Sequence, residues 1–193
     1  MHRDKSFTGS GHWKGLQGVS ALSYRCGYCS HDVGSAEGLE TEDKQSYIRV
    51  CPQCQGPTFF AVGERQWPGP RIGTSITHLS SDIDSLHEEA RSSVAANAFT
   101  GAVMLCRKIL MHTAVDKGAA TSLSFQQYVE WLVSERYAPR GAETWLDYIR
   151  TRGNEANHEI VVMGKEDAKG VLLFTEALLR SVYELPGLVP PVP

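Results

Sequence analysis

Two Cys-x-x-Cys pairs near the N-terminus constrain the fold of this chain more than any other feature. The pairs are Cys26 with Cys29 and Cys51 with Cys54, and 21 residues separate them, which is close to the spacing of four-cysteine zinc sites. Each pair places two thiolates on one side of a tight turn, and two such turns can close a tetrahedron around one ion. Because a closed four-thiolate shell leaves no position for water or substrate, we predict one structural zinc ion per chain.

Two disulfides or a redox-active pair are the alternative interpretation of these cysteines. The chain has five cysteines, and the odd one, Cys106, lies in an apolar helical pattern that is typical of a core position. An odd number of thiols suits a reducing compartment. The longest apolar stretches fall far short of the about 20 residues that span a membrane. We therefore expect a cytoplasmic protein with no membrane segment.

The apolar pattern changes along the chain of 193 residues. Short alternating stretches around the cysteines predict strands, and Trp67-Pro68-Gly69-Pro70 then interrupts the pattern. From Leu79 onward the apolar residues repeat about every three and a half positions, as in helices. We predict a mainly α protein with five segments: a flexible leader over 1–22, a β-rich zinc ribbon over 23–66, a linker over 67–78, a helical domain over 79–186 and a Pro-rich tail over 187–193.

Apolar stripes and capping residues predict about five helices in the second part. Ser80 to Asp82 offer caps for a helix that runs to about Ala98, and Lys117-Gly118 is a stop signal for the next one. Ser124 can cap a third helix. Trp145 and Ile149 mark a fourth helix, and a fifth is expected from about Lys165 to Tyr183.

The end of the fourth predicted helix is unusually polar, with the sequence Arg150-Thr151-Arg152-Gly153-Asn154-Glu155-Ala156-Asn157-His158. On an uninterrupted helix, Arg152 and His158 would point about 120° apart, so they converge only if the helix distorts near Gly153. In contrast, Arg150, Asn154 and His158 would share one stripe of a continuous helix. Either arrangement gathers polar groups.

A histidine can transfer a proton near neutral pH, and the planar fork of an arginine matches two phosphate oxygens. Arg152 and His158 would therefore suit cleavage of RNA without a metal, because the 2′-hydroxyl of RNA is itself the nucleophile. The structural alternative is that the same polar side chains satisfy backbone groups at a helix break. Spacing alone leaves both interpretations open.

Several motifs together resemble the domain of unknown function 4145 family. They are the two cysteine pairs, a helix with Ala98-x-x-Gly101-Ala102-x-x-x-x-Cys106-Arg107-Lys108-x-Leu110, the segment Ile149-Arg150-x-x-Gly153-Asn154-x-x-x-His158, and Glu166-Asp167-Ala168 before an apolar helix. The resemblance covers roughly residues 24–185. That family is similar to the HEPN superfamily of helical bundles, many of which are metal-independent ribonucleases with active sites at dimer interfaces.

The resemblance implies an HEPN-like bundle, a homodimer and RNA as a partner. The superfamily motif, an arginine followed after four to six residues by a histidine, falls on Arg152 and His158 as catalytic residues, with Asn154 in support. Gly153 stands where active members usually have a polar residue. Substrate-binding roles would fall to Arg107, Arg150 and Asn157. The alternative is a non-catalytic module that binds a nucleotide, a nucleic acid or a protein.

Arg107 lies beside the apolar stripe of its helix, where a charge is costly unless an anion neutralises it. We expect a carboxylate partner, Glu88 or Glu89, more readily than a substrate phosphate. The family often has an acidic residue where Met111 stands, so a partner within that helix is absent here.

The charge of the chain argues against a large nucleic-acid surface. The net charge is −3 and the sequence pI about 6.2, so no global positive field exists. Residues 1–69 contain 7 Lys and Arg against 7 Asp and Glu. Arg25, Tyr28, Arg49 and Phe59 are candidates for a small nucleic-acid surface on the ribbon, but this charge balance does not favour it.

Overall fold

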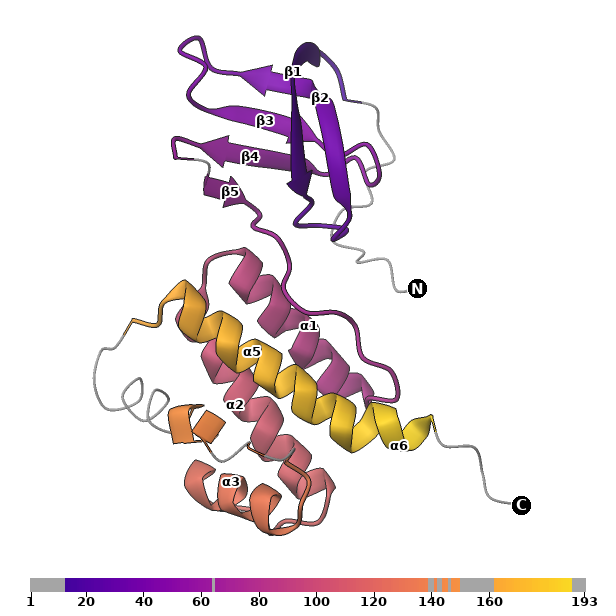
Figure 1. Cartoon of the computed structure of the whole chain (residues 1–193), viewed down its shortest axis with the longest axis vertical. Helices are drawn as coiled ribbons and strands as arrows, with labels where there is room; N and C mark the ends of the chain where they lie inside the picture. The colour runs from indigo at the N-terminus through magenta and orange to yellow at the C-terminus, as the bar shows by residue number, and fades with distance from the viewer. Residues whose placement is uncertain are drawn as a thin grey trace. The chain divides into compact units, whose positions relative to one another are not determined.

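A computed structural model describes residues 13–63, 65–138, 141, 144–145, 147–149 and 162–188. The chain divides into two compact units, Met1–Arg71 and Ile72–Pro193. The first unit is a β-sheet and the second is helical (Figure 1). The prediction of a small β-rich ribbon followed by a helical bundle is confirmed.

The sheet is an antiparallel meander of five strands in the order β1-β2-β3-β4-β5. The strands are β1 (Gln17–Arg25), β2 (Asp32–Glu40), β3 (Tyr47–Val50), β4 (Pro57–Ala61) and β5 (Arg65–Trp67). β1 begins at Gln17, inside the segment that we expected to be a flexible leader. The pairing of Gln17 with Gly38 on β2 accounts for this early start, because ladder hydrogen bonds outweigh a Gly- and Ser-rich composition.

One face of the sheet holds a small aromatic core. The ring of Phe60 meets Tyr24 edge-on at 5.2 Å and stacks on Tyr47 at 5.1 Å. The opposite face carries an apolar row that runs across four strands in register, Leu39 beside Ile48, Ile48 beside Phe59 and Phe59 beside Trp67. Leu39 and Phe59 in this row are exposed.

The helical unit contains α1 (Ser81–Ala95), α2 (Phe99–Asp116), α3 (Phe125–Ser134), α5 (Lys165–Leu179), its π-helical continuation η2 (Arg180–Glu184) and α6 (Leu185–Gly187). The Ser80 side chain caps α1 and the Ser124 side chain caps α3, as predicted. α1 ends before Ala98 because Asn97 adopts a left-handed conformation, with φ +61°, which terminates a helix.

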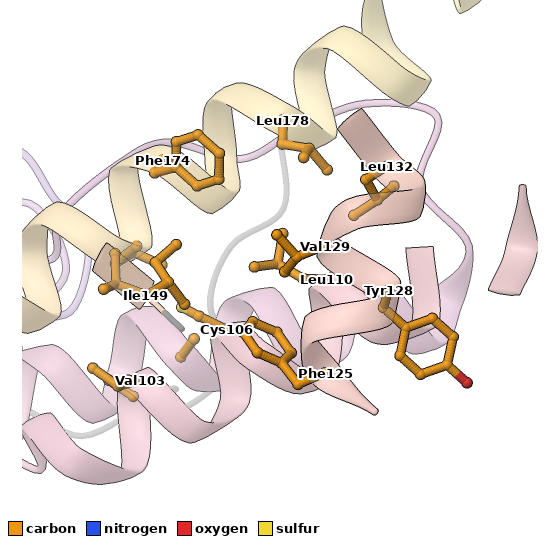
Figure 2. Close-up of a cluster of buried hydrophobic side chains, with 14 of the residues drawn as sticks. Val103, Cys106, Leu110, Phe125, Tyr128, Val129, Leu132, Ile149, Phe174 and Leu178 are labelled. Atoms are coloured by element: carbon orange, nitrogen blue, oxygen red, sulfur yellow. The ribbon is translucent and has the colours of Figure 1, made fainter. Parts of the chain in front are cut away.

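The helices α2, α3 and α5 enclose the main core, with α1 packed against α2. Figure 2 shows Cys106 and Leu110 of α2 facing Val129 and Leu132 of α3 and Leu178 of α5. Ile149, the last of the helical residues 144–145 and 147–149, is fully buried in the same cluster. No helix among the described residues is both long enough and apolar enough to cross a membrane.

Residues 72–77 are fixed against the helical unit by hydrogen bonds. Arg91 on α1 donates to the carbonyl oxygens of Ile72 and Gly73, at 2.9 and 3.0 Å. Glu176 on α5 accepts from the backbone N–H and the hydroxyl of Thr74, both at 3.1 Å. Gly73 has φ +71°, and a Cβ atom there would collide with the Glu176 carboxylate. The chain that enters the helical unit is therefore firmly attached to α1 and α5.

Candidate functional site

The four predicted metal ligands converge on one point of the ribbon. The Sγ atoms of Cys26, Cys29, Cys51 and Cys54 all lie within 4.8 Å of one another. The Sγ atoms of Cys26 and Cys54 are 3.7 Å apart, and those of Cys29 and Cys51 are 3.8 Å apart. Two zinc–sulfur bonds of about 2.3 Å at the tetrahedral angle place sulfur atoms about 3.8 Å apart. The cluster therefore fits one zinc ion, and these distances are too long for disulfide bonds.

Each cysteine pair forms the same tight turn. The N–H of Ser30 donates to the carbonyl of Cys26 at 3.0 Å, and in the second turn Gln55 donates to Cys51 at 2.8 Å. Ser30 and Gln55, each directly after the second cysteine of its pair, both adopt positive φ, 59° and 63°. Gly56 then passes beside the Tyr28 ring, where a Cβ atom would lie 2.6 Å from the ring. The two turns are equivalent halves of one metal site.

The electrostatics of the cluster also favour a bound cation. Burial raises the pKa of the Cys26 thiol to about 11 and also raises that of Cys54. The thiolate forms of Cys26 and Cys54 are therefore disfavoured in this position unless a cation neutralises them. Four cysteine ligands complete a tetrahedral shell, so the site is structural and offers no open position for catalysis.

The ribbon residues expected to form a small nucleic-acid patch do not lie together. Arg49 is only 2% exposed and pairs with Glu40 at 2.8 Å. Arg25 pairs with Asp32 at 3.1 Å. Phe59 is on the opposite face of the sheet from Arg49, because the two alternate in the β3–β4 register. The structure gives no support to that patch.

Arg107 is the most unusual charged side chain of the helical unit. It lies on α2 between the buried residues Cys106 and Leu110, and it is only 6% exposed. Its guanidinium carbon lies 4.4 Å from the centre of the Phe125 ring on α3. The Nη1 atom is buried and has no hydrogen-bond partner among the described residues. Burial lowers the pKa of this guanidinium, as expected for a cation whose charge is not neutralised.

The predicted pairing of Arg107 with Glu88 or Glu89 is wrong. Glu88 instead bonds Arg91 one turn along α1, with a distance of 2.6 Å between Nη1 and Oε1. Glu89 is exposed. Arg91 takes the carboxylate because it lies three residues from Glu88 on the same face of α1. The structural explanation that we expected for Arg107 is thereby removed.

The other predicted site residues lie outside the described residues: Arg150, Arg152, Asn154, Asn157 and His158. Their roles remain predictions. Residues on both sides of them are fixed in the core, Ile149 on one side and Met163 on the other, and both are buried. The Met163 N–H donates to Thr100 Oγ1 on α2 at 3.1 Å.

Asp167 links the residues that precede the polar segment with those that follow it. The hydroxyl of Tyr148 donates to one carboxylate oxygen of Asp167, and the N–H of Gly164 donates to the other at 3.1 Å. Trp145 stacks on Phe174 of α5 at 6.0 Å with an angle of 14° between the rings, yet it is 43% exposed. The Glu166-Asp167-Ala168 motif therefore contains a residue that holds the start of α5 to the helical residues 147–149.

His87 is a buried polar residue that sequence reasoning did not single out. It lies on the inner face of α1, fully buried, and neither ring nitrogen has a hydrogen-bond partner among the described residues. Burial and the nearby charge of Arg91 lower its pKa. Only its position on the apolar stripe of α1, four residues after Ile83 and three before Ala90, could have indicated burial.

The fold and the cysteine cluster define a protein in which a β-sheet with a four-cysteine cluster that fits a zinc ion is followed by a helical bundle. A family model described as a domain of unknown function (DUF4145) matches residues 88–189, which is more than half of the chain. The chain therefore belongs to this family. The match begins within α1 and leaves out the ribbon, whereas we expected it to start near residue 24. No curated protein and no solved structure matches the chain.

Proposed function

We propose that the helical unit binds RNA and cleaves it without a metal ion, as an HEPN-like ribonuclease. The observation that carries this proposal is the buried Arg107 guanidinium, whose Nη1 atom has no partner among the described residues. A buried cation without an anion costs several kcal/mol. A phosphate oxygen relieves that cost and accepts charge-assisted hydrogen bonds, which are roughly twice as strong as neutral ones.

The chemistry is assigned to residues of the polar segment. His158 removes the proton from a 2′-hydroxyl, and the resulting oxygen attacks the adjacent phosphorus. Arg152 stabilises the negative charge that develops on the phosphate oxygens. The 5′-oxygen leaves with a proton from solvent, which gives a 2′,3′-cyclic phosphate and a 5′-hydroxyl. Asn154, Arg150 and Asn157 position the strand, and Arg107 holds one of its phosphates.

A labelled single-stranded RNA tests this function with the full-length zinc-loaded chain. We expect cyclic-phosphate products from the wild type and a loss of about 100-fold or more in cleavage rate for His158→Ala, with RNA binding unchanged. Arg107→Met should weaken binding about 10- to 100-fold, which corresponds to a charged hydrogen bond worth about 1.5–3 kcal/mol. Lys108→Met, one residue along on the exposed side of α2, is the matched control and should bind as the wild type does.

Absence of RNA binding by the wild type would overturn the proposal. Binding without cleavage would remove His158 from any mechanism and leave a non-catalytic RNA-binding module, the alternative that the sequence leaves open.

A further inference from the structure

The way in which Arg107 is enclosed limits the kind of phosphate that it can bind. The residues one turn before and after it on the same side of α2, Val103 and Leu110, are fully buried. The Phe125 ring covers one face of the guanidinium. The Nη1 atom is buried, and only 6% of the whole residue reaches the surface. An anion must therefore enter among apolar side chains to reach this arginine.

An internal phosphodiester is poorly suited to such an entry. It carries a nucleoside on each side, so both neighbouring sugars would have to follow the phosphate into an apolar environment. A terminal phosphate monoester is attached on one side only and can enter end-on with three free oxygens. At neutral pH it also carries a charge of about −1.5 to −2, compared with −1 for a diester.

No carboxylate among the described residues forms an ion pair with Arg107. Met111, one turn further along α2, is uncharged, and the Glu88 carboxylate on α1 is bonded to Arg91. The flat guanidinium can donate two parallel hydrogen bonds to two oxygens of one phosphate. A diester also offers two such oxygens, so the preference for a monoester comes from its end-on access and its larger negative charge.

We propose that Arg107 binds a terminal phosphate monoester of an RNA strand. This inference rests on the proposed function for the identity of the strand, while the preference for a monoester is separate from it. A strand anchored by its end is cut at a fixed number of nucleotides from that end, so the substrate class is end-phosphorylated single-stranded RNA.

The test uses one oligoribonucleotide sequence, methylated at every 2′-oxygen to prevent cleavage, in three forms: 5′-phosphorylated, 3′-phosphorylated and unphosphorylated. Binding to the full-length zinc-loaded chain is measured by fluorescence anisotropy. We expect one phosphorylated form to bind the wild type about tenfold or more tightly than the unphosphorylated form. That advantage should disappear in Arg107→Met and persist in Lys108→Met. Arg107→Lys, which keeps the charge but loses the planar fork, should retain part of it.

Equal affinity for all three forms in the wild type would overturn the inference and leave the proposed RNA binding intact. An advantage that survives in Arg107→Met would also overturn it. Inorganic phosphate provides an independent measurement, because a rise in melting temperature that depends on Arg107 supports the monoester site even if no RNA binds. In that case the proposed function fails and the phosphate site remains. Circular dichroism confirms that each variant is folded.

Discussion

The ribbon and the helical unit are each stabilised in a different way. In the described part of the ribbon, the sheet cluster has four buried members, Tyr24, Cys26, Cys51 and Phe60, and two of these are metal ligands. The helical unit buries apolar side chains from all of its main helices in one cluster. A domain as small as the ribbon cannot fold on so little apolar burial. We therefore expect the ribbon to need a bound metal ion for folding, whereas the helical unit is stabilised by its own core.

The difference extends to the surfaces of the two units. On the ribbon, one face of a single-layer sheet carries the row of Leu39, Ile48, Phe59 and Trp67. Leu39 and Phe59 in this row are exposed. In the helical unit the corresponding apolar stripes of α2, α3 and α5 face one another and are buried. A metal site can hold a sheet together without covering both of its faces, but a helical core forms only where the faces meet.

Removal of the metal site should produce the largest difference in stability between the two units. Zinc binding in small domains contributes about 10–16 kcal/mol to folding, so Cys26→Ser should abolish zinc binding and unfold the sheet. The helical circular dichroism signal and its melting temperature should stay unchanged. Metal content and thermal melts measure both. Cys106→Ala, which alters the cysteine of the helical core, should keep one zinc per chain. Loss of the helical transition in Cys26→Ser would contradict the independence of the two units.

A cavity in the helical core should destabilise the helical unit and leave the ribbon unaffected. Leu110 is fully buried, so Leu110→Ala should destabilise the helical unit by about 2–5 kcal/mol while zinc content stays constant. Denaturant unfolding measures the change. Met104→Ala on the exposed side of the same helix is the control, expected within about 0.5 kcal/mol of the wild type. A similar loss in both variants would show that α2 is not packed as described.

Acid should weaken the helical unit through His87. Its pKa is lower in the folded state than its ordinary value of 6.5, so below that pH the unfolded chain binds more protons than the folded one. Stability then falls with decreasing pH by up to about 1.4 kcal/mol per pH unit until the folded-state pKa is reached. Asp84, Glu88 and Glu176 oppose this shift, and Arg91 favours it.

His87→Leu should remove this part of the acid sensitivity in melts between about pH 7 and 5, while His112→Gln, at an exposed position of α2, should not. If the stability of His87→Leu falls with pH as steeply as that of the wild type, another group is responsible.

The smallest expected effect is at the start of α3. The Ser124 hydroxyl accepts from the Gln127 N–H at 3.3 Å, and the Gln127 side chain accepts from the Ser124 N–H at 2.8 Å. Ser124→Ala should cost about 1 kcal/mol of helical-unit stability, measured by urea unfolding. Thr121→Ala, at an exposed position before the helix, should cost little. Equal costs would mean that the capping pair does not stabilise α3.

Local signals in the sequence predicted much of this architecture. The spacing of the cysteine pairs indicated the metal cluster, and Ser80 and Ser124 marked two helix starts, because a cap acts through residues only three positions away. The start of β1 at Gln17 could not be predicted in this way. It depends on pairing with Gly38, and no local pattern encodes that partner.

The candidate phosphate site shows the same limit. The apolar stripe of α2 predicted that Arg107 would be near the core. That its Nη1 atom has no hydrogen-bond partner within the described ranges depends on distant parts of the chain. Phe125 approaches it from α3, and Arg91 engages the carboxylate that we expected to neutralise it. Such competition between side chains is decided by packing in three dimensions, which periodicity does not describe.

The hydrogen bonds of Asp167 to Tyr148 and Gly164 have a consequence for how this protein can diversify. Together with the buried Ile149 and Met163, they fix the chain just before residue 150 and just after residue 161 through contacts that use no side chain from the segment between. Substitutions in that segment should therefore leave the bundle folded, so its sequence can change without a change of scaffold.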